Sequence, residues 1–487
     1  MPGPTSLATP LSADVCERAL DAHDARFDGI FYVGITTTKI YCRPVCPARV
    51  SYHDRRRFFD TAASAERAGF RPCLRCRPEL APGRALIDAV PNLARVAAYR
   101  IGAGALNGQG VAQLARELGV SDRHLRRVLE RELGVSPVEL AQTHRLLLAK
   151  RLLADTSLPV TRIAYASGFQ SLRRFNSVFR ERYRLSPRAL RRGTPATPAT
   201  DLVRLTLAYR APLAWDALLV LLGTGGMPGV EVLAGGRYGR TVRIEHRSGV
   251  VFAADAAAAA RTHLEVDVSP SLLPVLMPLL ARLRHLFDLD AQPTVVDAQL
   301  ERGGLAALVR RRPGLRIPGA LDGFEAAFRA LLGGRTRAAV VEALGEPVDT
   351  GIPALCRLAP DAERVAEAGA TRLAAVGVPR GRAETLQRLA AAIADGRLRL
   401  EPGCDVAAAH RALLTIDGVG ERLATAIVMH ALHWPDAFPA ADRALRARAE
   451  QWRPWRAYAA MHLRLEGGSA TRPAPRAAPR RGPPDRP

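Results

Sequence analysis

The fold of the N-terminal part is decided by two short segments, Tyr41-Cys-Arg-Pro-Val-Cys-Pro47 and Gly69-Phe-Arg-Pro-Cys-Leu-Arg-Cys-Arg-Pro78. Three residues separate the cysteines of the first pair, two separate those of the second, and 26 residues lie between the pairs. Each close pair can supply one edge of a tetrahedron of thiolates, which is the arrangement that structural zinc prefers. Four unconnected free thiols are the alternative. The spacing therefore predicts one Zn²⁺ ion bound by Cys42, Cys46, Cys73 and Cys76.

Arginines crowd these cysteines, as expected for a site that faces phosphate. Arg43 and Arg71 lie within the two segments and are candidate DNA contacts. Together with Asp24-Ala-Arg-Phe-Asp-Gly29 and Thr36-Thr-Thr, the segments resemble the Ada-type methylphosphotriester repair domain over residues 12–83. The resemblance implies that the thiolate of Cys42 accepts a methyl group from DNA, and that the other three cysteines complete the zinc site.

The resemblance also implies a charge switch at the cysteines. Four thiolates on Zn²⁺ sum to a charge of about −2, and methylation of one sulfur leaves about −1. The methylated domain would therefore repel the DNA backbone less and bind it more tightly. A zinc-dependent redox sensor without methyl transfer is an alternative that the surrounding arginines oppose.

The composition indicates a polyanionic partner. The 487 residues include 70 lysines and arginines against 47 acidic residues, a net charge of +23, and residues 1–200 hold 32 of the basic and 17 of the acidic side chains. This excess predicts double-stranded DNA as a partner, and RNA polymerase is a further candidate partner. No run of about 18 uncharged apolar residues exists, so we expect no membrane span. The N-terminus lacks the order of a signal peptide, so we expect a cytoplasmic, nucleoid-associated protein.

Residues 111–187 contain an internal repeat. The segment Val111-Ala-Gln-Leu-Ala-Arg-Glu-Leu-Gly-Val120 returns as Val160-Thr-Arg-Ile-Ala-Tyr-Ala-Ser-Gly-Phe169, with the alanine and the glycine each shifted by 49 residues. A small alanine lets two helices cross, and a glycine takes the left-handed turn between them. Each copy then continues into a second helix with arginines on its outward face. The repeat therefore predicts two helix-turn-helix units.

Two such units joined by a helix at residues 144–153 resemble the AraC-type DNA-binding domain over residues 90–192. The resemblance implies that the second helix of each unit lies in the major groove. For each arginine on these helices, a solvated helix face is the alternative. The candidate DNA contacts are Arg123, His124, Arg126 and Arg127 in the first unit, and Gln170, Ser171, Arg173, Arg174 and Asn176 in the second.

The second half of the chain begins with an apolar alternation at residues 202–210 and an apolar helix at 215–222, which predict an α+β unit. Residues 317–465 are predicted to be helical. Within them, Leu413-Leu-Thr-Ile-Asp-Gly-Val-Gly-Glu-Arg-Leu-Ala-Thr-Ala-Ile427 predicts two helices joined by a Gly-Val-Gly hairpin. The backbone amides at Gly418 and Gly420 can bind a DNA phosphate at the N-terminus of the second helix.

Asp442 follows this hairpin by 22 residues, at the end of Pro435-Asp-Ala-Phe-Pro-Ala-Ala-Asp442. Hairpin and aspartate resemble the helix–hairpin–helix DNA glycosylases, and residues 201–465 as a whole resemble 3-methyladenine DNA glycosylase II (AlkA). The resemblance implies that an alkylated base is flipped out and its N-glycosidic bond hydrolysed, with Asp442 as the catalytic carboxylate and Trp452 as an aromatic of the base pocket. A lyase would need a lysine near the hairpin, but the last lysine is Lys150. We therefore expect a monofunctional glycosylase.

Several positions depart from the glycosylase pattern. Glu421-Arg-Leu-Ala424 stands where the family usually has Pro-Trp-Thr-Ala, which removes an aromatic and places a negative charge beside the hairpin. Gly334-Arg335 stands where a glutamine and a wedging side chain are usual, so Arg335 is the candidate wedge. Asp442 can also be interpreted as a helix N-cap. The alternative to an active glycosylase is a methylation-sensing regulator whose glycosylase half has decayed.

We expect a multidomain protein that acts in the adaptive response to DNA alkylation, as a transcriptional activator and a DNA repair enzyme. Proline-rich stretches at 191–200 and after residue 466 indicate linkers. The expected units are a small α+β zinc domain (1–85), an all-α double helix-turn-helix domain (86–195), an α+β domain (196–315), an all-α helix–hairpin–helix glycosylase domain (316–465) and a disordered tail (466–487).

Overall fold

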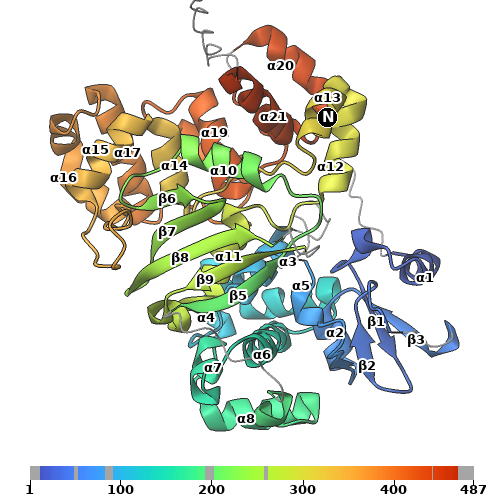
Figure 1. The fold of residues 1–487 in the computed structure, drawn as a ribbon. Coiled ribbons are helices and arrows are strands. Elements are labelled where there is room, and N and C mark those ends of the chain that lie inside the picture. Colours follow the sequence, from blue (N-terminus) through green and yellow to red (C-terminus); the bar gives the residue numbers. More distant parts are fainter. Residues whose placement is uncertain are drawn as a thin grey trace, which may run out of the picture.

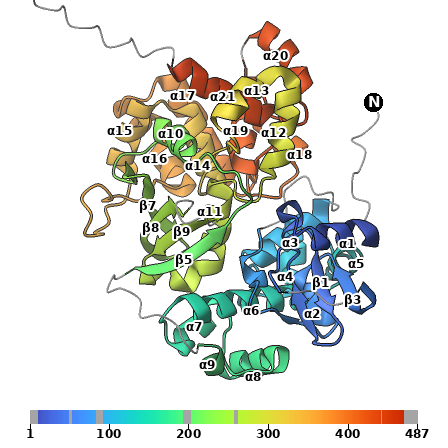
Figure 2. The ribbon, with the colours of Figure 1, turned by 45° about the vertical axis from the view of Figure 1, so that its right-hand side comes forward.

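The computed structural model describes residues 11–48, 53–82, 92–191, 202–256, 262–440 and 442–469. It confirms the multidomain fold class, with two separate sheets and many helices. In Figures 1 and 2 a five-stranded sheet lies in the middle of the molecule, with the C-terminal helices on one side and the two N-terminal units on the other. None of the helices in these ranges combines the length and the apolar character that a bilayer crossing requires.

The first unit is a four-stranded sheet with two short helices, α1 (Ala13–Asp21) and α2 (Ala62–Arg67). Its strand order is β3-β1-β2-β4, and the pairing of β2 with β4 is parallel. Because Tyr41 pairs with Pro72 in that register, the chain brings one cysteine of each close pair to the same end of the sheet. The strands are β1 (Tyr32–Ile35), β2 (Ile40–Cys42), β3 (Arg56–Phe59) and β4 (Arg71–Pro72).

The second unit consists of two helix-turn-helix motifs that share the long helix α6 (Pro137–Asp155). A capping box starts α6, in which Ser136 and Glu139 each accept a hydrogen bond from the other's backbone amide. Gly119 and Gly168 have φ of +70° and +88°, which confirms the left-handed turns. The other helices are α3 (Asn92–Gly102), α4 (Val111–Glu117), α5 (Asp122–Leu133), α7 (Val160–Ala166), α8 (Leu172–Tyr183) and α9 (Pro187–Leu190).

The third unit is an antiparallel sheet of order β5-β9-β8-β7-β6, and it confirms the predicted α+β character. Its strands are β5 (Val203–Ala208), β6 (Glu231–Ala234), β7 (Arg237–Ile244), β8 (Arg247–Asp255) and β9 (His263–Val268). Its helices are α10 (Trp215–Thr224), α11 (Leu276–Leu286), α12 (Pro293–Leu300) and α13 (Ala306–Arg311).

The fourth unit is helical, as predicted. Helix α21 continues to Ser469, so the first residues of the predicted tail are helical, whereas the rest of that tail lies outside the described residues. The helices are α14 (Gly323–Leu331), α15 (Gly334–Leu344), α16 (Ala362–Ala375), α17 (Arg380–Ala394), α18 (Val406–Leu414), α19 (Glu421–Leu432), α20 (Arg443–Ala449) and α21 (Arg456–Ser469).

One hydrophobic core crosses the boundary between the second and third units. Phe175 and Phe179 of α8 belong to the same buried cluster as Leu205 of β5 and Phe287 after α11. The stretch 192–201, which contains most of the predicted linker, lies outside the described residues. The two halves of the chain are therefore packed together rather than merely tethered.

Candidate metal centre and nucleic-acid interfaces

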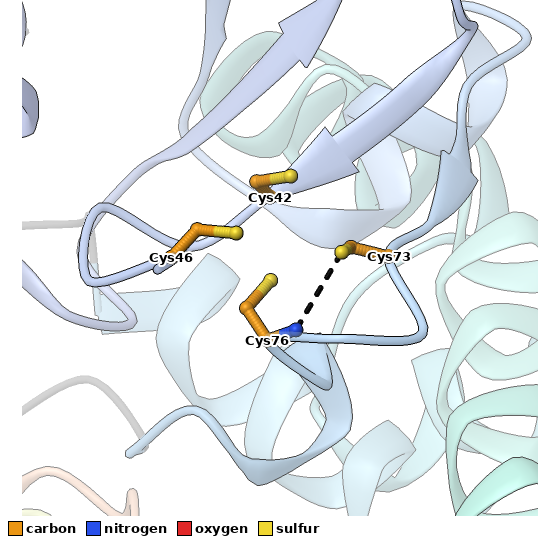
Figure 3. A group of neighbouring side chains, drawn as sticks. All are labelled: Cys42, Cys46, Cys73 and Cys76. Carbon is orange, nitrogen blue, oxygen red and sulfur yellow. Dashed lines mark hydrogen bonds between the residues drawn. The ribbon is translucent and has the colours of Figure 1, made fainter. Parts of the chain in front are cut away.

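The four predicted cysteines converge between the end of β2 and the loop after β4. Figure 3 shows their side chains pointing toward one another, and all four sulfurs lie within 4.8 Å of one another. Every one of them is buried, with at most 7 % of the residue exposed. Backbone amides contact three of the sulfurs. Arg75 and Cys76 donate to Cys73 Sγ at 3.3 and 3.5 Å, Arg43 donates to Cys76 Sγ at 3.4 Å, and a backbone hydrogen bond from Ala48 lowers the pKa of Cys46.

The electrostatics of the cluster require a cation. Hydrogen bonds from the neighbouring thiols, first that of Cys42, lower the pKa of Cys73, and the thiol of Cys46 raises the pKa of Cys42. Four thiolates cannot ionise together in a buried site unless a positive ion compensates them. Zn–S bonds of about 2.3 Å place the sulfurs of a tetrahedron roughly 3.8 Å apart. The donor set and its spacing therefore fit Zn²⁺.

The two arginines predicted beside the cluster differ in their surroundings. Arg43 is turned inward, where it forms an ion pair with Asp28 and donates from Nη1 to the Cys76 carbonyl at 3.1 Å. Its guanidinium therefore braces the loop that carries two of the cysteines. The half-buried side chain of Arg71 makes no hydrogen bond or ion pair within the described ranges, so it is available to a ligand.

Helix α6 docks the zinc unit onto the helix-turn-helix pair. Lys150 Nζ, which is buried, forms an ion pair with Glu79 and donates to the Cys73 carbonyl at 3.3 Å. Nearby, the buried carboxylate of Glu66 accepts from Tyr41 at 3.1 Å and from Thr143 at 2.9 Å. Glu66 joins a zinc-unit strand to α6, so the cysteine cluster is rigidly connected to the helix that both DNA-binding motifs share.

The predicted recognition helices are α5 and α8, and their outward faces are exposed. Arg123, Arg173 and Arg174 are exposed and form no side-chain hydrogen bond or ion pair with the described part of the chain. Arg126 instead binds Asp122 at 2.9 Å, and Arg127 lies 3.3 Å from His124.

The predicted DNA contacts at the start of α8 have different surroundings. Ser171 is the N-cap of α8, since its hydroxyl accepts from the Arg174 amide at 3.3 Å. Gln170 is exposed and Asn176 is half-buried. The free arginines on α5 and α8 provide the positive charge that a DNA backbone requires.

A cleft of about 1500 Å³ runs through the helical unit and reaches the predicted hairpin. Gly418 and Gly420 line it, and Gly420 is the N-cap residue of α19 with no side-chain cap, so the first amides of that helix are open to an anion. Asp442 is the N-cap of α20 and accepts from the Ala444 amide at 2.8 Å, so it does cap a helix, as the alternative interpretation predicts. It is exposed and is not itself among the described residues that line the cleft, although Ala440 and Leu445, two and three positions away in the sequence, are.

Trp452 and Arg335 also lie outside the lining of this cleft. Trp452 is fully buried, and its indole N–H donates to the Gly303 carbonyl at 2.8 Å, so its ring is part of a core and does not face the cleft. Arg335 is exposed in the first turn of α15, at the rim formed by Gly333 and Gly334.

Sequence reasoning missed arginines that line the cleft, among them Arg337 of α15 and Arg464 of α21. A signal existed for the first, because Arg337 shares one helix stripe with the buried Val340, Val341 and Leu344, where an apolar residue is expected. No comparable signal marks Arg464, whose place in the cleft depends on how α21 packs.

Comparison with known families accounts for most of the chain. The metal-binding domain of Ada matches residues 15–79, a helix-turn-helix domain matches residues 114–193, and the AlkA N-terminal domain matches residues 204–322.

Individual relatives match both the parts and the whole. A protein from Mycobacterium tuberculosis described as a probable bifunctional transcriptional activator/DNA repair enzyme AlkA is 38 % identical over 478 residues, which cover 92 % of this chain and 95 % of the relative. DNA-3-methyladenine glycosylase 2 of Escherichia coli is 33 % identical over 53 % of this chain and 95 % of its own. The bifunctional activator/DNA repair enzyme Ada of Escherichia coli is 32 % identical over 30 % of this chain and 39 % of its own.

Proposed function

The chain belongs to the family of AlkA-type bifunctional transcriptional activator/DNA repair enzymes, and from this premise we propose a three-part function in the cytoplasm. The zinc unit takes methyl groups from DNA methylphosphotriesters onto Cys42. The helix-turn-helix pair then activates transcription of repair genes at a promoter, in contact with RNA polymerase. The C-terminal half excises alkylated bases of the 3-methyladenine type.

The distribution of hydrogen bonds over the cluster supports Cys42 as the methyl acceptor. Within the described ranges, backbone amides donate to Cys73 and Cys76, and a backbone hydrogen bond from Ala48 lowers the pKa of Cys46, whereas no backbone amide donates to Cys42 Sγ. A thiolate that accepts amide hydrogen bonds has a lower pKa and is a weaker nucleophile. This difference is the observation that carries the methyl-transfer proposal.

In the proposed transfer, a lone pair of Cys42 Sγ forms a bond to the methyl carbon, and the carbon–oxygen bond of the triester breaks. The electron pair of that bond stays on the phosphate, which leaves as an ordinary diester anion. Zinc supplies the charge that keeps the thiol deprotonated at neutral pH. Because a thioether is neutral, the cluster loses one negative charge, which weakens its repulsion of the DNA backbone.

The lysine and the carboxylate that dock the cluster explain how this change can reach the promoter-binding unit. Lys150 contacts the backbone of Cys73 and lies on α6, which joins the two motifs. The zinc unit and the helix-turn-helix pair are therefore packed together, so a change in charge at the cluster occurs in the same unit as the exposed arginines of α5 and α8. The result is tighter binding of promoter DNA after repair.

The position of Asp442 supports the excision proposal. Its carboxylate is exposed, its sequence neighbours Ala440 and Leu445 line the cleft, and the open amides of α19 lie at the same cleft. A phosphate held at α19 would anchor the strand while the flipped base enters the cleft. Asp442 would then stabilise positive charge on the sugar and orient the attacking water.

Methyl transfer is tested with duplex DNA that carries labelled methylphosphotriesters. The label should appear on the protein and should be lost in Cys42→Ala. The matched control is Cys16→Ala, because Cys16 is equally buried but lies outside the cluster. Labelling that persists in Cys42→Ala would show that another cysteine is the acceptor.

Base excision is tested by release of 3-methyladenine from duplex DNA. Asp442→Asn should abolish release, because asparagine keeps the helix cap but lacks the charge. The control is Asp405→Asn, which makes the same change at the N-cap of α18. The alternative, a regulator with a decayed glycosylase half, requires that neither the wild type nor any variant releases a base.

A further inference from the structure

Helix α19 presents one of its faces to the cleft of the helical unit. Arg422, Ala426 and His430 follow one another at intervals of four residues, and all three line the cleft. Side chains four residues apart lie on the same face of a helix, so these three form one stripe. The stripe starts beside the open amides at Gly420, the proposed phosphate site, and ends at His430. It therefore leads from the anchored DNA strand into the cleft.

The imidazole of His430 is held in one tautomer. Its Nδ1 lies 2.7 Å from the carbonyl oxygen of Pro318, and because a carbonyl oxygen can only accept, Nδ1 carries the proton. Burial lowers the pKa of the ring to about 4, and the charges of Arg464 and Arg329 act in the same direction, against the hydrogen bond to Pro318. The ring is therefore neutral at neutral pH, and Nε2 carries a lone pair that can accept a hydrogen bond.

This lone pair is accessible to a ligand. The ring of His430 is half-buried and lines the cleft. In the part of the chain that the structure describes, no group donates to its Nε2. The Nε2 atoms of His285 and His433 also lack a partner, but those two atoms have no exposed surface, whereas Nε2 of His430 does. An acceptor of this kind is available to a donor that enters the cleft.

The other side-chain oxygens of the cleft are less suited to accept from a base. Among the described lining residues they belong to Thr224, Thr385 and Glu421. The hydroxyl of Thr224 already accepts from an arginine at 3.2 Å, and Thr385 is buried. The carboxylate of Glu421 is 69 % exposed at the hairpin, close to the proposed phosphate site. His430 therefore provides the free, uncharged side-chain acceptor of the described lining.

We propose that His430 is a specificity-determining residue whose Nε2 accepts a hydrogen bond from the exocyclic amino group of a flipped, alkylated adenine. The proposal rests on the proposed glycosylase function and deepens it, because it names the residue that selects among alkylated bases. A flipped base is read at its Watson–Crick edge. At C6, that edge carries an amino donor in 3-methyladenine and a carbonyl oxygen in 7-methylguanine. An oxygen opposite the Nε2 lone pair would leave two acceptors unpaired.

The positive charge of the alkylated base strengthens this contact. Methylation at N3 of an adenine nucleotide makes the base cationic, and resonance spreads the charge onto the amino group at C6. Its N–H is then a charge-assisted donor, about twice as strong as a neutral one. The base becomes neutral as the glycosidic bond breaks, so the hydrogen bond is strongest before the reaction. Its loss should therefore weaken binding of the lesion more than it slows bond cleavage.

The test separates the two nitrogens of the ring by substitution in the full-length chain. His430→Asn should still donate to the Pro318 carbonyl, but it has no acceptor at the position of Nε2. His430→Gln should place an amide oxygen near that position and lose the bond to Pro318. His430→Met removes both groups and fills the space with an adaptable apolar side chain. Thermal unfolding should show the asparagine variant to be more stable than the other two.

The substrate is duplex DNA methylated with a labelled methyl donor, which contains 3-methyladenine and 7-methylguanine together. Because both lesions compete for one protein, the ratio of the released bases measures selectivity. His430→Asn and His430→Met should lower the ratio of 3-methyladenine to 7-methylguanine by about tenfold, whereas His430→Gln should keep most of it. In His430→Asn, the protein concentration for half-maximal release of 3-methyladenine should rise, with little change in the maximal rate.

The control is His433→Asn, which makes the same substitution three residues later, at a buried ring outside the described lining of the cleft. It should leave the ratio unchanged. If the wild type releases neither base, the glycosylase function fails and this inference falls with it. If the wild type releases only 7-methylguanine, or if His430→Asn and His430→Met keep the wild-type ratio, the inference alone is overturned.

Two further outcomes would also overturn it. A loss of both bases in equal proportion in His430→Asn would show that the ring supports the fold of the cleft and does not select a base. A ratio in His430→Gln as low as that in His430→Asn would show that an acceptor at this position is not what the base requires.

Discussion

Trp452 is a structural residue in this arrangement, and its substitution should affect stability more than base recognition. A Cβ built on Gly303 would lie 2.6 Å from Trp452 Cδ1, so only a glycine lets the indole approach this closely. Trp452→Phe leaves the Gly303 carbonyl without its donor and should cost about 1–3 kcal/mol of unfolding free energy. Base release by the folded variant should be unchanged.

Thermal unfolding and a release assay on the same preparation check this expectation. Trp434→Phe is the control, because that side chain is half-buried and donates no hydrogen bond within the described ranges. It should cost less than Trp452→Phe. A Trp452→Phe variant of normal stability that loses base release would place the ring at the substrate instead.

Because of Glu66, the stability of the contact between the zinc unit and α6 should depend on pH. Burial raises the pKa of this carboxyl to about 7, although Arg182, Thr143 and Tyr41 partly oppose the rise. In the unfolded chain a glutamate has a pKa of about 4.3. Between these values the folded state binds a proton that the unfolded state has released, so the contribution of Glu66 to stability falls as the pH rises toward 7.

The neutral variant Glu66→Gln removes this dependence. The unfolding free energy of Glu66→Gln, relative to that of the wild type, should therefore rise with pH. The total rise from pH 5 to pH 8 should be up to about 3 kcal/mol. Unfolding temperatures of both proteins across this range measure the difference. A difference that does not change with pH would mean that Glu66 is ionised throughout.

At the residue scale, the sequence predicts the cysteine cluster well and the base cleft poorly. The spacing within each cysteine pair is local, and the parallel register of β2 with β4 joins the two pairs. By contrast, the packing of α21 decides that Arg464 lines the cleft, and the contact of Trp452 with Gly303, far away in the sequence, decides that the tryptophan does not. Aromatic residue type alone therefore led to the wrong surroundings for Trp452.

At the scale of elements, the two glycines of the hairpin have different roles. Gly418 has φ of +89°, and a Cβ there would lie 1.9 Å from Thr385 Oγ1 on α17. Gly420 has φ of −87°, and a Cβ there would meet no atom within 4 Å. Gly418 is needed for the turn and for its contact with α17, whereas Gly420 is needed only where a ligand approaches the amides of α19.

This difference predicts opposite effects for two otherwise identical substitutions. Gly418→Ala should lower the unfolding temperature, with a cost of at least about 1 kcal/mol from the positive φ alone. Gly420→Ala should leave the unfolding temperature unchanged and weaken DNA binding instead. Adding Thr385→Ala to Gly418→Ala should recover part of the lost stability. Equal unfolding temperatures for the two single variants would contradict the assignment.

At the scale of the whole molecule, the sequence predicts the four folded units but not the hydrophobic core that the second and third units share. The Pro- and Thr-rich stretch at 191–200 predicts a linker between the two halves of the chain. In addition, the structure joins α8 and β5, on either side of that linker, through a common core. The sequence pattern of an apolar residue is the same whether the residue is buried within one unit or between two units. No local pattern could therefore predict this contact.

The shared core predicts that the halves stay together when the chain between them is cut. A protease site inserted within residues 192–201 should be cleavable, yet the two fragments should co-elute in size-exclusion chromatography and unfold in one transition. Separation would expose Phe175, Phe179, Leu205 and Phe287 together with their neighbours, and burying each such side chain contributes about 1.5–3 kcal/mol. Fragments expressed separately should therefore bind an apolar dye more strongly than the cut complex does. If the cut halves separate without loss of stability, methylation at Cys42 cannot influence the glycosylase half through this core, and the chain would be two independent proteins on one tether.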